Sequence, residues 1–257
     1  MLEIRGVSKT YNPGTVTEQC LFDKFSLSVE DGQFISIVGS NGSGKTSLLN
    51  IICGSIPIES GDVLVGGESI SKKRDFQRYI TMGRVYQNPS MGTCPNLTML
   101  ENLSLADNKG KTFGFSRGVN KKRTDYYRSE LESLGLGLED KLGVKMGSLS
   151  GGQRQAVALL MATMTPLKFL ILDEHTAALD PKTAEVIMQL TDKVVREKKL
   201  TAMMVTHNLR YAVEYGDRLL MMDRGHVVLD RIGAEKQNTS MDDLLALFNK
   251  ISIECGN

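Results

Sequence analysis

This chain of 257 residues has no large excess of positive or negative charge, few cysteines and no long apolar stretch. Its 31 lysines and arginines nearly balance its 30 aspartates and glutamates. A protein that binds nucleic acid regardless of base sequence needs a broad basic field, which this balance does not provide. We therefore expect no nucleic-acid partner.

Cysteine occurs only four times, at Cys20, Cys53, Cys94 and Cys255. These positions are far apart, and none belongs to a CxxC pair or to a Cys/His cluster with the spacing of metal ligands. A cysteine metal site is therefore excluded, and the thiols are predicted to be reduced cytosolic ones.

No apolar run approaches the ~18 residues that are needed to span a bilayer. The amino-terminal segment MLEIRGVSKTY carries charges where a secretory signal would need an apolar centre. The sequence therefore predicts a soluble chain, and its length suits one α/β domain with a smaller insertion. There is no internal repeat, which predicts a single cassette.

The first third of the chain predicts strands followed by a loop and a helix. Residues 2–38 alternate apolar and polar positions in short β-rich stretches, which end in the apolar run Phe34 to Val38. A glycine-rich loop follows, and then a helical pattern that Gly54 and Pro57 end. The order is buried strand, loop, helix.

The last part of the chain alternates strand and helix patterns. Residues 169–172 and 202–205 are apolar runs, and between them a helix is expected to begin at Pro181 with Asp180 as its cap. This alternation implies a parallel sheet. The apolar face of that helix is predicted to consist of Val186, Ile187, Leu190 and Val194.

Residues 88–148 have a helical pattern without long buried strands. Thr98 and Glu101 have the spacing of a capping box, and Lys121 to Leu134 is predicted to be a second helix. We therefore divide the single domain into a core, residues 1–87 and 149–257, and an inserted helical subdomain, residues 88–148.

The glycine-rich loop matches the P-loop pattern. Its glycines let backbone amides approach phosphate oxygens at a helix N-terminus, where Lys45 would reach the β and γ phosphates and Thr46 would bind Mg²⁺. An ordinary glycine turn is the alternative, although the four fixed positions arise by chance in only roughly one or two chains per hundred. The loop consists of Gly39, Ser40, Asn41, Gly42, Ser43, Gly44, Lys45 and Thr46.

Two further segments contain candidate functional groups, namely a pair of carboxylates and a second helix start that is suited to bind an anion. The apolar run 169–172 ends in Asp173, a candidate Mg²⁺ partner, and Glu174, a candidate general base for an attacking water. Leu149 to Gln153 reads LSGGQ and opens a helix, which predicts a second anion site at Ser150 and its following amides. Ser150 as a simple helix cap is compatible with this prediction.

The three segments G-S-N-G-S-G-K-T, L-S-G-G-Q and F-L-I-L-D-E, in this order, resemble the ATP-binding cassette (ABC) family over essentially the whole chain. The resemblance implies a P-loop NTPase fold of the α/β class, with a mainly parallel sheet, an N-terminal antiparallel β subdomain and an inserted helical subdomain. It also implies ATP and Mg²⁺ as cofactors.

The resemblance further implies roles for individual residues. Tyr11 would stack on adenine, and His207 would form a hydrogen bond to the γ-phosphate. Gln87 would sense Mg²⁺ and the attacking water, and Asp180 would communicate across a dimer. The implied catalytic residues are Glu174, His207, Lys45 and Gln87, and the metal-binding ones are Thr46, Gln87 and Asp173. The implied nucleotide contacts are Tyr11, Gly39, Ser40, Asn41, Gly42, Ser43, Gly44, Lys45, Thr46, Ser47, Ser150, Gly151, Gly152, Gln153 and Asp180.

By the same resemblance the chain is one half of a paired ATPase. A second copy or a homologous subunit would complete each ATP site. A membrane permease would dock near residues 88–106, at the cytoplasmic face of the membrane, and an extracellular solute-binding protein would act through that permease. The segment 174–181 resembles amino-acid-type import cassettes.

Several alternatives stay open. The chain could serve a soluble assembly such as iron–sulfur cluster building, or bind nucleotide without hydrolysing it. His175 stands where the family often has proline, and it is either an additional titrating group or a turn residue. The basic segment 109–128 either faces an anionic lipid or partner, or is a solvated surface with aromatic residues packed beneath it.

Overall fold

The computed structural model describes residues 1–112 and 118–254, of which residues 251–254 are described only by their helical backbone. Two sheets form the framework, one with four strands and one with six. In spatial order the smaller sheet contains β2 (Gln19–Val29), β1 (Leu2–Tyr11), β4 (Ser60–Val65) and β5 (Glu68–Ser69). The larger sheet contains β10 (His226–Ile232), β9 (Arg218–Asp223), β3 (Phe34–Gly39), β8 (Ala202–Val205), β7 (Phe169–Asp173) and β6 (Met82–Val85).

The smaller sheet is antiparallel throughout, whereas the larger one is parallel from β6 to β9 and has β10 as an antiparallel edge. The predicted fold class is therefore confirmed, including the antiparallel N-terminal part. The predicted strands at residues 34–38, 169–172 and 202–205 are present as β3, β7 and β8. Strands β6, β9 and β10 were not predicted from the sequence.

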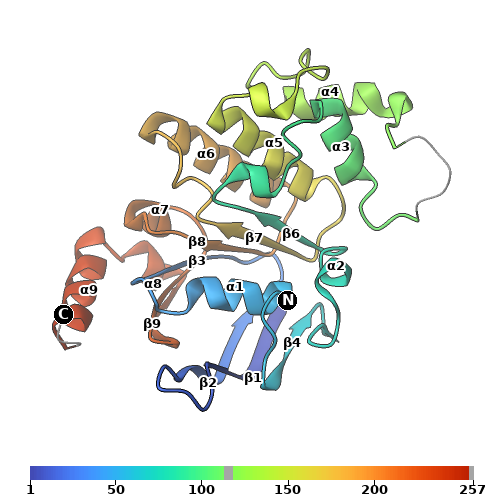
Figure 1. Cartoon of the computed structure of the whole chain (residues 1–257). Coiled ribbons are helices and arrows are strands. Elements are labelled where there is room, and N and C mark those ends of the chain that lie inside the picture. Colours follow the sequence, from blue (N-terminus) through green and yellow to red (C-terminus); the bar gives the residue numbers. More distant parts are fainter. Residues whose placement is uncertain (113–117, 255–257) are drawn as a thin grey trace.

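Side chains of the parallel strands alternate between two apolar cores. Leu170 and Leu172 of β7 belong to one core, while Ile171 between them belongs to the other. The first core lies under α5 (Gly151–Thr163) and α6 (Pro181–Glu197), and the second lies under α1 (Lys45–Cys53), so these helices cover opposite faces of the sheet (Figure 1). Strands buried on both faces explain the continuous apolar runs in the sequence.

The segment between β6 and α5 carries helices and no strand among its described residues. Thr98 caps α3 and exchanges both capping-box hydrogen bonds with Glu101, as predicted. The predicted helix at residues 121–134 is a short 3-10 turn followed by α4. The elements here are η1 (Pro89–Met91), α3 (Met99–Asp107), η2 (Lys121–Arg123), α4 (Thr124–Glu132) and η3 (Met146–Ser148). The division at residues 88 and 148 remains our prediction.

The remaining helices are short or lie near the carboxyl end. They are α2 (Asp75–Arg78), α7 (Leu209–Glu214), α8 (Ala234–Gln237) and α9 (Met241–Glu254). Within the described ranges, no helix is both long and apolar enough to cross a lipid bilayer. Cys20, Cys53 and Cys94 are free thiols, and Cys255 lies outside the described residues.

The predicted apolar face of α6 needs one correction. Ile187 and Leu190 are buried and Val194 packs against the same core, but the side chain of Val186 is 41% exposed. Each residue turns an α-helix by about 100°, so Val186 lies beyond the edge of the stripe that Ile187 occupies. Met188 and Thr191 are buried in its place.

The described part of the basic segment is largely partnered within the chain. Lys109 is partly buried and donates to the backbone oxygen of Met82, and Arg123 pairs with Asp107. Tyr127 is fully buried and donates its hydroxyl hydrogen to Asp107. Phe113, Phe115 and Arg117 lie outside the described residues, and a lipid or partner contact stays a prediction.

The turn between β9 and β10 packs closely against β2 of the smaller sheet. Gly225 has φ +79°, and a Cβ atom there would collide with the backbone oxygen of Leu21 in β2. We expect Gly225→Ala to lower the free energy of unfolding by about 2 kcal/mol or more, because both the left-handed backbone and the close approach disfavour alanine. Denaturant unfolding would measure this change.

Gly143→Ala is the matched control, because a Cβ atom at Gly143 meets no other atom within 4 Å. The same free energy of unfolding for both alanine variants would contradict this account of the turn.

Candidate functional site

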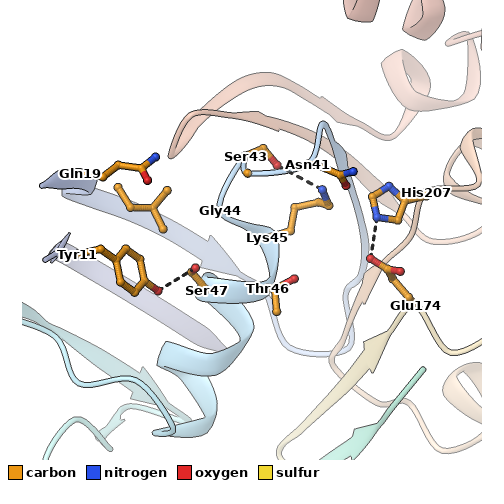
Figure 2. Close-up of a pocket in the computed structure, with 12 residues that line it drawn as sticks. Tyr11, Gln19, Asn41, Ser43, Gly44, Lys45, Thr46, Ser47, Glu174 and His207 are labelled. Atoms are coloured by element: carbon orange, nitrogen blue, oxygen red, sulfur yellow. Dashed lines mark hydrogen bonds and ion pairs between the residues drawn. The ribbon is translucent and has the colours of Figure 1, made fainter. Parts of the chain in front are cut away.

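The predicted P-loop lines a pocket of about 250 Å³ together with residues from both sheets. Figure 2 shows the side chains that converge on it from β1, β2, the loop, α1 and the ends of β7 and β8. The lining residues are Tyr11, Gln19, Leu21, Asn41, Gly42, Ser43, Gly44, Lys45, Thr46, Ser47, Glu174 and His207. Segments that are far apart in the sequence therefore meet at one pocket.

The side chain of Lys45 forms hydrogen bonds with the residues of the glycine-rich loop. Its ammonium group donates to the backbone oxygens of Gly39 and Ser40 at 2.7 and 2.9 Å and to the Ser43 hydroxyl at 3.3 Å. The side chain is 5% exposed, and burial lowers the pKa of Lys45 although the charge of Glu174 opposes that shift. A cation held at a helix N-terminus among free amides is suited to bind phosphate.

The turn between β9 and β10 supports the loop from outside. The amide of Gly225 donates to the Ser43 backbone oxygen at 2.9 Å, and the Ser40 hydroxyl donates to Asp223 at 3.2 Å. Gly44 caps α1 with φ +103°, a conformation that favours glycine, and a Cβ atom there would lie 3.1 Å from the ring of Phe22, which is a tight contact. The loop is therefore held in shape by its neighbours.

Glu174 and His207 face each other across the pocket. The Nε2 atom of His207 lies 2.7 Å from a carboxylate oxygen of Glu174. Glu174 has φ +47°, which is uncommon for a residue other than glycine and often marks a functional site. Its backbone amide donates to the backbone oxygen of Val205 at 2.9 Å, which fixes this turn at the end of β7. The carboxylate thereby points into the pocket (Figure 2).

Tyr11 forms one wall of the pocket. Its hydroxyl lies 3.0 Å from the Ser47 hydroxyl on α1, so the ring of Tyr11 is fixed beside the loop. Gln19 and Leu21 of β2 extend the same wall, and the sequence analysis missed both. Apolar and polar residues alternate in β2 as in any half-buried strand. No local sequence signal therefore marked Gln19 or Leu21 as pocket residues.

The metal-binding candidates offer oxygen ligands of the kind that Mg²⁺ prefers. Thr46 is exposed in the pocket, and its hydroxyl makes no hydrogen bond to any described residue. Asp173 does not line the pocket, and its Oδ2 accepts a hydrogen bond from Arg84 at 2.6 Å. Oδ1 of Asp173 has no protein partner within residues 1–112 and 118–250, so one carboxylate oxygen is available to a metal ion.

Gln87 is not brought to the pocket in this structure. It is exposed, follows β6 by two residues and is absent from the lining. Its predicted roles as metal sensor and catalytic residue therefore stay predictions.

The LSGGQ residues lie apart from the pocket and are not among its lining residues. Ser150 caps α5, where its hydroxyl accepts from the amide of Gln153, and the Gln153 side chain accepts in return from the Ser150 amide. Asp180 likewise caps α6, by accepting from the amide of Thr183. The predicted second anion site therefore corresponds to a helix start on the opposite face of the sheet from α1 (Figure 1), and its binding of an anion stays a prediction.

His175 is buried and does not reach the pocket. It belongs to the turn after Glu174, and its Nε2 atom lies 3.0 Å from the Thr191 hydroxyl on α6. Because Thr191 donates its own hydrogen to the Ile187 backbone oxygen, it accepts from a neutral His175. Burial lowers the pKa of His175 to about 4. The turn interpretation fits these contacts better than a titrating group in the site.

The ABC transporter family model matches residues 22–177. The chain is 46% identical over 248 residues to the tyrosine transport ATP-binding protein of Clostridioides difficile (strain R20291), with 96% of this chain and 98% of that protein covered.

Two further relatives extend the comparison. The chain is 31% identical over 233 residues to the methionine import ATP-binding protein MetN 1 of Pseudomonas putida (strain KT2440), with 89% of this chain and 66% of that protein covered. A solved dimer of the ATP-binding cassette MJ0796, in a post-hydrolysis state bound to ADP and Pi, is 30% identical with a TM-score of 0.75. That match covers 90% of this chain and 98% of the solved one.

The buried His175 predicts a measurable pH effect on stability. Its pKa is depressed in the folded state, so its contribution is fully present above pH 6.5 and is lost as the pH falls towards 4. Between pH 7 and pH 5 we expect His175 to account for about 2 kcal/mol of lost unfolding free energy. Denaturant unfolding of wild type and His175→Gln at both pH values measures it, with exposed His226→Gln as control. An equal pH dependence in wild type and His175→Gln would contradict the assignment.

Proposed function

This chain belongs to the ABC transporter family, and we propose that it is the ATPase subunit that powers import of an amino-acid-type solute. Members of this family hydrolyse ATP to drive transport, and the chain is such an ATP-binding subunit. The observation that carries the catalytic part of the proposal is the convergence of Lys45, Glu174 and His207 on one pocket. The names of the tyrosine transport and methionine import relatives support the solute class.

The chemistry that we propose follows from the positions of the pocket residues. Lys45 and the loop amides would bind the β and γ phosphates and offset their charge. Thr46 and Asp173 would hold Mg²⁺, which neutralises charge on the phosphate oxygens. Glu174 would accept a hydrogen bond from the attacking water, with its carboxylate held in place by His207.

One chain supplies only half of the contacts that this proposal needs. The pocket contains the P-loop and Glu174 but no LSGGQ residue. We propose that Ser150 and the amides of Gly151 and Gly152 from a second ATPase subunit close the pocket, while Asp180 lies at the same interface. The dimeric relative bound to ADP and Pi supports this arrangement.

The membrane partner is proposed to dock near residues 88–106. Exposed apolar side chains occur in and beside this stretch, including Met91 at 69% and Leu105 at 45% exposure, together with Phe76 and Ile80 on and after α2. We propose that these exposed apolar side chains contribute to the docking surface. The subunit would therefore lie at the cytoplasmic face of the membrane, held by a permease to which a solute-binding protein delivers its cargo.

Glu174→Gln tests the catalytic assignment. The amide cannot act as a base, so we expect ATP turnover to fall by roughly 100-fold or more while ATP binding is retained. The variant should also accumulate as a dimer with Mg²⁺ and ATP. Phosphate release, nucleotide binding and light scattering measure these three properties. Near-normal turnover would refute Glu174 as the base.

The double variant Glu174→Gln/Ser150→Arg is the control for pairing. The long arginine side chain would obstruct the interface without touching Lys45, so this protein should bind ATP but stay monomeric. A dimer of unchanged stability would exclude Ser150 from the interface.

Import is tested in cells that carry the Glu174→Gln subunit as the sole copy. We expect uptake of one labelled amino acid, with tyrosine the first to assay, to fall to the level of a deletion strain, because transport then lacks turnover. A Glu197→Gln subunit carries the same type of substitution at the exposed last residue of α6, outside the pocket lining, and should restore uptake. Normal amino-acid uptake combined with purification away from any membrane protein would favour a soluble assembly instead.

A further inference from the structure

Arg84 lies beside Asp173 under the P-loop helix, with its side chain largely buried. It is the third residue of β6, which pairs in parallel with β7, so its side chain reaches the same face of the sheet as Asp173. The guanidinium donates to Asp173 Oδ2 at 2.6 Å and to the Asn50 side chain of α1 at 2.9 Å. It also stacks 4.7 Å from the ring centre of Tyr86. Three elements therefore fix its position.

The charge of Arg84 is held close to a partly buried carboxylate. The side chain of Arg84 is 8% exposed and that of Asp173 is 16% exposed. Burial alone would lower the pKa of Arg84, but its hydrogen bond and charge interaction with Asp173 raise it. An arginine does not lose its proton in a protein. Arg84 is therefore a permanent positive charge at this position.

The two neighbouring acids at the end of β7 each have a cationic or hydrogen-bonding partner. Arg84 binds Asp173, and His207 binds Glu174. Two neighbouring carboxylates without such partners would offer hard oxygen ligands to any divalent cation in solution. A positive charge about 3 Å from one of them repels such an ion strongly in a poorly solvated site.

We propose that Arg84 is a fixed counter-ion for Asp173 that prevents free divalent cations from occupying the site, so that Mg²⁺ binds only together with nucleotide phosphates. This inference rests on the proposed function, since it concerns the Mg²⁺ that ATP hydrolysis requires. Arg84 occupies Oδ2 and leaves Oδ1 open, so Asp173 can contribute one oxygen when phosphates supply further negative charge. Arg84 is a positioning residue and touches no reacting atom.

The test measures binding of Mn²⁺ alone to the nucleotide-free protein by electron paramagnetic resonance. We expect no binding to wild type at millimolar Mn²⁺, and a gain of at least about tenfold in affinity for Arg84→Met, which removes the charge and keeps an unbranched side chain. Arg84→Lys keeps the charge and should bind as little Mn²⁺ as wild type. A merely structural role of Arg84 would not create a new metal site.

Arg218→Met is the matched control. Arg218 in β9 also forms an ion pair, in which its guanidinium nitrogen lies 2.6 Å from Oδ2 of Asp230 in β10. Its side chain is 11% exposed, and Asp173 is not its partner. It should gain no Mn²⁺ binding. A second control, Arg84→Met/Asp173→Asn, should lose the gained binding.

Four outcomes would overturn the proposal: Mn²⁺ binding to nucleotide-free wild type, no gain in Arg84→Met, an equal gain in Arg84→Lys, or a gain that survives Asp173→Asn. Failure of the proposed function is distinguishable, because it would appear as absent ATP turnover by wild type in the presence of Mg²⁺. The Mn²⁺ measurements on nucleotide-free protein do not depend on turnover.

Discussion

The buried ammonium group of Lys45 holds the glycine-rich loop together, and the shape of the pocket depends on this contact. A loop rich in glycine has many conformations in the unfolded chain, and it needs fixed partners to keep one shape. Lys45 supplies them from within by donating to two backbone oxygens and a hydroxyl of the loop. The turn between β9 and β10 supplies them from outside through Gly225. A preformed loop binds phosphate without having to become ordered first.

Around this loop, charges are arranged in pairs that come from different strands. Asp173 and Glu174 are neighbours in sequence, but the positive φ of Glu174 directs its carboxylate into the pocket while Asp173 faces Arg84 under α1. We propose that Glu174 serves the attacking water molecule and that Asp173 serves the metal ion. In our proposal, the local strain at Glu174 is what separates these two roles.

The sheet itself explains why a single chain is incomplete in the proposed mechanism. The helix that follows the P-loop covers one face of the sheet, and the helix that begins after Ser150 covers the other. Both helix starts are suited to anions, but they cannot contact the same phosphate within one copy of the chain, because the sheet lies between them. In the proposed mechanism, pairing with a second subunit would bring one start of each kind together, and hydrolysis would then depend on association.

Short-range signals in the sequence were enough to predict the P-loop and its helix, the buried strands at β3, β7 and β8, the caps at Thr98, Ser150 and Asp180, and the likeness to ABC proteins. They did not reveal β9, β10, Gln19, Leu21 or the partner of Asp173, because the importance of these lies in contacts between distant segments. Arg84 has no motif, and only the parallel pairing of β6 with β7 places it beside Asp173. The local sequence pattern determines which segments form helices, strands and the glycine-rich loop. The order of the strands in the sheet decides which charged side chains come into contact. The physical reason is that electrostatic interactions depend on distance in space rather than on separation along the chain.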